Sequence, residues 1–110
     1  MKGMEDSDFQ QRADEAIQNL YAKLAQAADE FDFDVDMNSG ALSVEFDSPR
    51  DRFVVSPNSP VRQIWVSAHV QSFKLDWDDK SSAFVLPASG QTLEALLSDA
   101  IRKHIPDFSL

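Results

Sequence analysis

The chain has 110 residues, which is enough for one domain with a hydrophobic core but too few for two. It has no cysteine, which excludes disulfides, thiolate metal sites and a cysteine nucleophile, and its three glycines form no phosphate-binding loop. No signal peptide is recognised and no apolar run approaches the roughly 20 residues of a membrane span, so we expect a soluble protein in a reducing compartment.

The net charge of −9 is concentrated near the N-terminus. Residues 1–36 contain ten acidic and three basic side chains, whereas residues 37–110 contain nine and seven. Such a field attracts cations or a basic protein surface and repels nucleic acid and anionic membrane. The alternative is a solvated acidic face that only aids solubility. A monomer is expected at this net charge.

Apolar residues at spacings of three and four predict a long first helix from about Ser7 to Asp29. Ser7 followed by Gln10 indicates a capping box at its start. Near the C-terminus, Thr92 is a good N-cap for a second helix, which Pro106 helps to end.

Between the helices the hydrophobic period changes to two, which predicts strands joined by short turns. The predicted strands are residues 33–37, 42–46, 53–55, 60–67, 73–77 and 83–86. The order helix, hairpin-linked strands, helix predicts an α+β two-layer sandwich, with two helices packed on one face of an antiparallel sheet of about six strands. Residues 1–110 are expected to form a single domain.

The fourth strand places its largest residue on the unexpected side. If Ile64 and Val66 face the core, then Trp65 lies on the opposite, solvated face. Such a tryptophan either anchors a partner or is covered by a loop. Trp77, which alternates with Leu75, is predicted to point toward the helices.

The residues reveal no catalytic site. His69 and His104 lie near a predicted turn and a predicted helix end, where we interpret them as solvated or capping residues. No nucleophile, base and orienting group can be combined from spacing.

Carboxylates are the ligands that hard cations such as Fe³⁺, Mg²⁺, Mn²⁺ and Ca²⁺ prefer. Asp32, Asp34 and Asp36 would be about 6.6 Å apart per step on one strand face, with Asp29 and Glu30 nearby. We therefore expect several weak, exchangeable surface sites rather than a closed cage.

Taken together, the chain from Asp6 to Ile105 resembles the frataxin family. The matching segments are residues 6–9, 13–14, 34–36, 38–42, 60, 63–67, 76–77, 89–90, 93 and 96–97. Each motif alone is loose, but this order and spacing are specific.

The resemblance implies an iron-binding regulatory protein or iron chaperone of iron-sulfur cluster assembly that contacts the cysteine desulfurase and the scaffold protein. It implies a bacterial cytoplasmic location, with the mitochondrial matrix as the alternative. The resemblance also implies an acidic ridge that binds Fe²⁺ or Fe³⁺ weakly and docks on a basic patch of the desulfurase. This ridge consists of Asp6, Asp8, Asp14, Asp29, Glu30, Asp32, Asp34 and Asp36. The implied scaffold-binding residues are Gln63, Trp65 and Lys74, where Lys74 replaces a relative's arginine and cannot reproduce its bidentate contacts.

One departure from the family pattern concerns the middle of the first helix. Where bacterial relatives carry acids, this chain has Tyr21, Ala22, Ala25 and Gln26, with Lys23 between two acidic clusters. We therefore expect this chain to bind iron more weakly than its bacterial relatives do, and its acidic ridge to serve mainly for docking on a protein partner. Two other classes remain as alternatives, namely a carboxylate-based ferroxidase and an acidic protein-interaction module without a metal role.

Overall fold

The computed structural model describes residues 5–31, 33–38, 40–47, 50–68 and 71–108. Their helices are α1 (Asp6–Ala28) and α2 (Leu93–Arg102), with a short 3-10 helix η1 (Ser59–Val61). The strands are β1 (Asp34–Asn38), β2 (Ala41–Asp47), β3 (Arg50–Asn58), β4 (Gln63–Ala68), β5 (Gln71–Asp78) and β6 (Ala83–Val85). No helix in this described part of the chain is long and apolar enough to cross a membrane.

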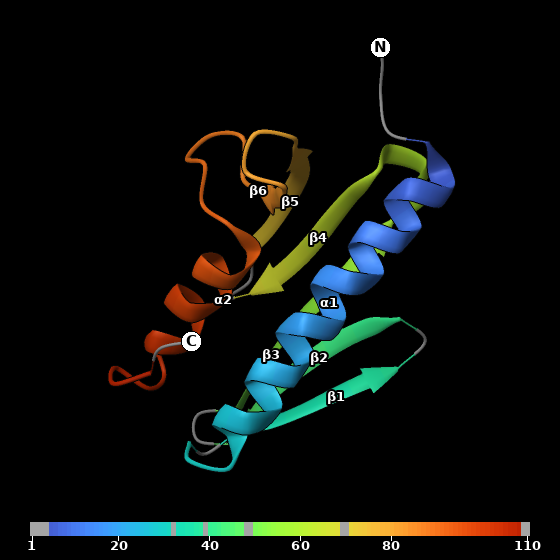
Figure 1. Ribbon diagram of the computed structural model, residues 1–110. Coiled ribbons are helices and arrows are strands. Elements are labelled where there is room, and N and C mark those ends of the chain that lie inside the picture. The colour runs from blue at the N-terminus through green and yellow to red at the C-terminus, as the bar shows by residue number, and fades with distance from the viewer. Residues whose placement is uncertain (1–4, 32, 39, 48–49, 69–70, 109–110) are drawn as a thin grey trace.

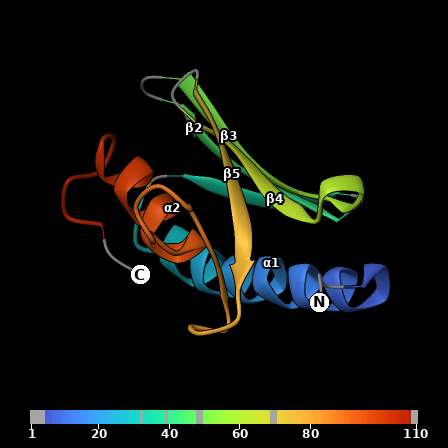
Figure 2. The ribbon, with the colours of Figure 1, turned by 90° about the horizontal axis from the view of Figure 1, so that it is seen from above.

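The six strands form one sheet in chain order, and each pairs antiparallel with its neighbours (Figure 1). Both helices lie on the same side of this sheet, as the view from above shows (Figure 2). No helix of the described residues lies on the other face, so the predicted two-layer α+β sandwich is confirmed. The predicted turn residue Ser39, the turn at residues 48–49 and His69 lie outside the described residues.

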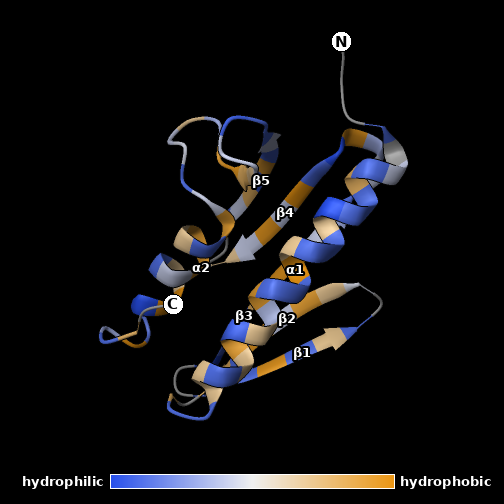
Figure 3. Ribbon diagram, viewed as in Figure 1, coloured by the Kyte–Doolittle hydropathy of each residue, from blue (hydrophilic) through white to orange (hydrophobic). Residues whose placement is uncertain are grey.

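The core lies between the helices and the inner face of the sheet. Along β4, Ile64 and Val66 are buried whereas Trp65 is exposed, which confirms the predicted sidedness of this strand. On α1, hydrophilic and hydrophobic residues alternate along the ribbon (Figure 3), and Phe9, Leu20 and other members of the predicted stripe are fully buried. Burial of this one stripe holds α1 against the sheet.

The start of α1 differs from the prediction. The helix begins at Asp6, and its N-cap is Glu5, whose side chain makes no capping hydrogen bond, so the capping box predicted at Ser7 is wrong. The first intrahelical bond instead joins the Phe9 N–H to the Glu5 carbonyl at 2.9 Å. Acidic residues in this first turn, such as Asp8, stabilise the positive end of the helix dipole without a capping bond.

Strand β3 is longer than the predicted strand of residues 53–55. It continues through Pro57 to Asn58. Proline lacks the N–H that a central strand position uses. The pairing with β2 ends at Leu42 and Val55, whereas the pairing with β4 continues to Asn58 and Gln63. Pro57 therefore occupies a position with a strand neighbour on one side, where proline is tolerated.

The C-terminal helix is fixed at both ends. The Thr92 hydroxyl accepts a bond from the Ala95 N–H at 3.2 Å, which confirms the predicted N-cap. Just past the helix, the His104 Nε2 atom lies 2.9 Å from Asp51 Oδ2, and its ring stacks on Phe46 at 4.3 Å between centroids. His104 is therefore a packed residue joining α2 to the β2 and β3 strands, not a solvated or capping one.

Candidate partner and metal surfaces

The acidic ridge predicted from the sequence is a surface formed by α1, its C-terminal end and β1. Its described side chains are exposed at Asp8, Asp14, Asp29, Glu30, Asp34 and Asp36. The side chain of Asp6 and the whole of Asp32 lie outside the described residues. Helix α1 packs along β1, which brings the end of the helix and the strand to the same edge of the sheet (Figure 1). We refer to the six described residues as the acidic surface.

The acidic surface contains separate groups of carboxylates rather than one cage. Asp14 on α1 and Asp29 at its C-cap are fifteen residues apart, which is about 22 Å along the helix axis. A single ion cannot bridge that separation. Among the residues that the structure describes, no three His, Asp or Glu side chains are close enough together to hold a metal ion. The arrangement suits several weak cation contacts.

Strand β1 shows the predicted alternation. Val35 and Met37 are partly buried against the core, and Asp34 and Asp36 are exposed on the outer face. The Asp36 Oδ1 atom accepts a hydrogen bond from the Met37 N–H at 3.1 Å, which leaves its second oxygen for other ligands. The carboxylates of β1 therefore face solvent, as cation or partner contacts require.

Sequence reasoning missed one acid beside this strand. Glu45 on β2 is the direct cross-strand partner of Asp34, so the Cβ atoms of the two residues are about 5 Å apart. Arg52 Nε lies 3.9 Å from the Glu45 carboxylate and offsets part of its charge. The alternation of Glu45 with buried Val44 and Phe46 is the signal that could have placed it on the outer face.

Lys23 lies between the two acidic groups along α1, as the sequence showed, and forms an ion pair with the second helix. Its ammonium group contacts both carboxylate oxygens of Glu94 on α2 at 2.8 Å, so its side chain is directed toward the second helix. Both side chains are about half exposed, so the pair contributes little to stability. The ion pair instead fixes where the positive charge of Lys23 lies, which is on the side of α1 that faces α2.

A second surface lies on the outer face of the sheet and contains all three predicted scaffold-binding residues. Trp65 is 37% exposed, and the Lys74 ammonium lies over its ring at 5.1 Å from the centroid. The Trp65 indole N–H donates to Gln63 Oε1 at 3.0 Å, and Gln63 Nε2 donates to Asp76 Oδ1 at 3.0 Å. We call these four residues the tryptophan cluster; Asp76 is the member that sequence reasoning missed.

The end of β5 carries the shifted titratable group of this surface. The Ser81 hydroxyl donates to Asp78 Oδ2 at 2.8 Å, and this bond lowers the pKa of Asp78 below its ordinary value of 3.8. Backbone N–H groups of Lys80 and Ser81 add to the effect. Asp78 is thus committed to the turn between β5 and β6 rather than to the tryptophan cluster.

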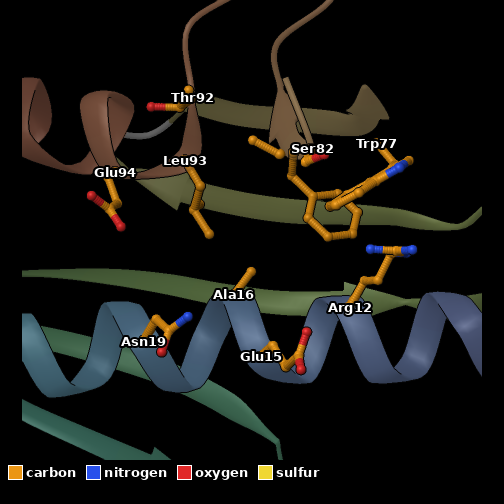
Figure 4. Close-up of a pocket in the computed structure, with 11 residues that line it drawn as sticks. Arg12, Glu15, Ala16, Asn19, Trp77, Ser82, Thr92, Leu93 and Glu94 are labelled. Atoms are coloured by element: carbon orange, nitrogen blue, oxygen red, sulfur yellow. The ribbon is translucent and has the colours of Figure 1, made fainter. Parts of the chain in front are cut away.

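A groove of about 420 Å³ lies on the helix side, between α1, β6 and the start of α2 (Figure 4). The Arg12 guanidinium stacks over the Trp77 ring at 4.6 Å, and Trp77 also contacts Phe84 edge-on at 5.2 Å. Trp77 therefore points toward the helix layer, as predicted. Neither the acidic surface nor the tryptophan cluster lines this groove.

Comparisons with known proteins agree with this arrangement. A frataxin-like domain model matches residues 2–107. The iron-sulfur cluster assembly protein CyaY of Azotobacter vinelandii is 31% identical over 96 residues, covering 86% of each chain. The mitochondrial frataxin of Caenorhabditis elegans is 27% identical over 105 residues, covering 92% of this chain and 77% of that protein. A solved frataxin from Psychromonas ingrahamii is similar with a TM-score of 0.83 and 25% identity, covering 96% of both chains.

Proposed function

This chain belongs to the frataxin-like family, and on that premise we propose that it acts in iron-sulfur cluster assembly as an iron-binding regulatory protein or iron chaperone. The observation that carries the proposal is the exposed Trp65, held by a hydrogen bond to Gln63 on a sheet face that no helix of the described residues covers. A partly solvated tryptophan in a fixed position is typical of an interface anchor. Co-precipitation with a cysteine desulfurase and a scaffold protein tests the proposal.

Iron would bind the acidic surface as cargo. Carboxylates are hard ligands that suit both oxidation states of iron, and the cross-strand Asp34 and Glu45 are the closest pair of acids across β1 and β2. Exposed carboxylates without a common centre bind cations weakly and exchange them readily. Such sites suit delivery of an ion better than its permanent retention, which is why we propose a binding protein rather than an oxidising enzyme.

The two surfaces would contact different partners. The acidic surface complements a basic patch, which is the docking mode proposed for the desulfurase. The tryptophan cluster offers an aromatic ring with a cation above it and polar groups around it, and is proposed to contact the scaffold protein. On the outer face of the sheet, Asp34 and Asp36 of β1 are separated from the tryptophan cluster of β4 and β5 by strands β2 and β3, so the two partners are proposed to bind side by side. The bacterial relatives favour a bacterial cytoplasmic setting for this assembly.

We expect a paramagnetic ion to reveal the iron contacts. Adding Mn²⁺ or Fe²⁺ to ¹⁵N-labelled protein should broaden the amide signals of Asp29, Glu30, Asp34, Asp36 and Glu45 first, because carboxylates are densest around β1. Affinity should be micromolar or weaker, since no closed set of ligands is present in the described residues. Broadening centred on His104 instead would reject this assignment.

Neutralising β1 should slow association with the desulfurase. Asp34→Asn combined with Asp36→Asn removes two exposed charges at nearly constant shape, so the association rate at low salt should fall roughly three- to tenfold and depend less on ionic strength. Biolayer interferometry at several salt concentrations measures both quantities.

The matched control removes two charges elsewhere, through Asp79→Asn and Asp107→Asn. These exposed residues lie outside the acidic surface. If the control slows association as much as the β1 pair, net charge alone steers docking. If neither variant changes the rate at low salt, the acids serve only as a solubilising face.

A further inference from the structure

The tryptophan cluster contains a chain of two hydrogen bonds that ends in a carboxylate. The indole N–H of Trp65 donates to Gln63 Oε1, and Gln63 Nε2 donates to Asp76 Oδ1, both at 3.0 Å. Gln63 and Asp76 are direct cross-strand partners between β4 and β5. The second bond is partly buried, so water competes with it less than on an open surface.

The chemistry of the two ends determines how the amide between them is oriented. An indole N–H can only donate a hydrogen bond, and an ionised carboxylate can only accept one. A reversed Gln63 amide would place its NH₂ group against the indole N–H and its oxygen against the carboxylate, losing both bonds. Asp76 therefore selects the one amide orientation in which Gln63 can also hold Trp65.

We propose that Asp76 is a positioning residue for partner binding, acting on Trp65 through the Gln63 amide. The Lys74 ammonium above the indole constrains the same ring from its face. A ring already held in its binding orientation loses less conformational entropy on docking, which strengthens the complex without a new contact. The claim that Trp65 docks rests on the proposed function, whereas the claim that Asp76 orients it concerns the free protein.

The positioning role can be tested without any partner. Asp76→Leu removes the acceptor at similar volume, so exchange of the Trp65 indole proton with solvent should become about fivefold faster and its ¹H–¹⁵N signal should shift or broaden. Asp76→Asn keeps an oxygen acceptor and should restore the native signal. The Trp77 indole donates to Asp79 at 2.8 Å and provides an internal reference that should not change.

Two further variants separate this route from a charge effect. Asp78→Asn removes one charge from the same strand two residues away, and it should leave the Trp65 indole signal unchanged. In a Gln63→Met background, Asp76→Leu should have no further effect, because the connecting amide is gone. A Trp65 indole signal that is insensitive to Asp76→Leu, or equally sensitive to Asp78→Asn, would overturn the proposal.

Binding to the scaffold protein gives the second readout. Asp76→Leu should weaken it about fivefold, and Asp76→Asn should largely restore it. If Trp65→Ala has no effect on scaffold binding, the proposed function fails while the indole measurements still decide the role of Asp76. A third outcome separates orientation from docking. In it, Asp76→Leu changes the Trp65 indole signal and yet leaves scaffold binding intact, although Trp65→Ala weakens that binding. This result would reject the role of Asp76 in docking.

Discussion

Trp65→Ala is expected to weaken scaffold binding by about 2 kcal/mol or more, while lowering the free energy of unfolding by less than about 1 kcal/mol. The ring lies on the outer sheet face, is 37% exposed and contributes no surface to the buried core. Its removal therefore costs a partner contact rather than packing. Isothermal titration with the scaffold protein and urea unfolding of the free protein measure the two quantities.

Trp77→Ala is the matched control, because it removes the same ring from the opposite face of the neighbouring strand. Trp77 packs on Phe84 and under Arg12, partly buried at the edge of the core. Its loss should cost about 1 to 3 kcal/mol of stability and leave scaffold binding by the folded protein unchanged. If Trp65→Ala is the more destabilising of the two, its ring supports the fold and the proposed binding face is wrong.

The alternation of apolar and polar residues was sufficient to place Gln63 and Trp65 on the outer face of the sheet. In a strand, every second side chain shares a face, so burial of Ile64 and Val66 requires Trp65 to face outward. The same rule placed Asp34 and Asp36 on the outer face of β1. These predictions succeeded because they depend on local geometry alone, once one face of the sheet is known to be covered.

Predictions that depend on which neighbour a side chain meets were less successful. The sequence placed Lys23 between two acidic clusters but did not predict its ion-pair partner Glu94, seventy-one residues away in the sequence. His104 was interpreted as solvated, yet it pairs with Asp51 and stacks on Phe46. Side-chain partners so distant in the chain are set by tertiary packing, which periodicity does not encode.

The missed members of both surfaces have a common cause. Glu45 joins Asp34, and Asp76 joins Gln63, through cross-strand register. Register follows from the turns and from the hydrophobic face together, so a shift of one residue would reverse every assignment. Each strand could be predicted separately, but the pairs that give these surfaces their chemistry appear only when the strands are aligned.

Phe53→Ala is expected to lower the free energy of unfolding by about 3 to 5 kcal/mol, the largest stability loss predicted here. Phe53 is fully buried on the inner face of β3, and its ring lies 5.2 Å from Phe46 and 5.9 Å from His104, measured between centroids. Truncation leaves a cavity in the core beside Phe46 of β2. Urea unfolding should show a lower midpoint with an unchanged slope.

The neighbouring residue provides the control for this prediction. Val54 lies on the outer face, opposite Ser43 and Ser67, so Val54→Ala should cost less than about 1 kcal/mol. Phe53→Ala should leave the affinity of the remaining folded protein for the scaffold unchanged, because Phe53 contacts neither surface. If Val54→Ala proved as costly as Phe53→Ala, β3 would be buried on both faces, and the open sheet face on which Trp65 is proposed to bind its partner would not exist.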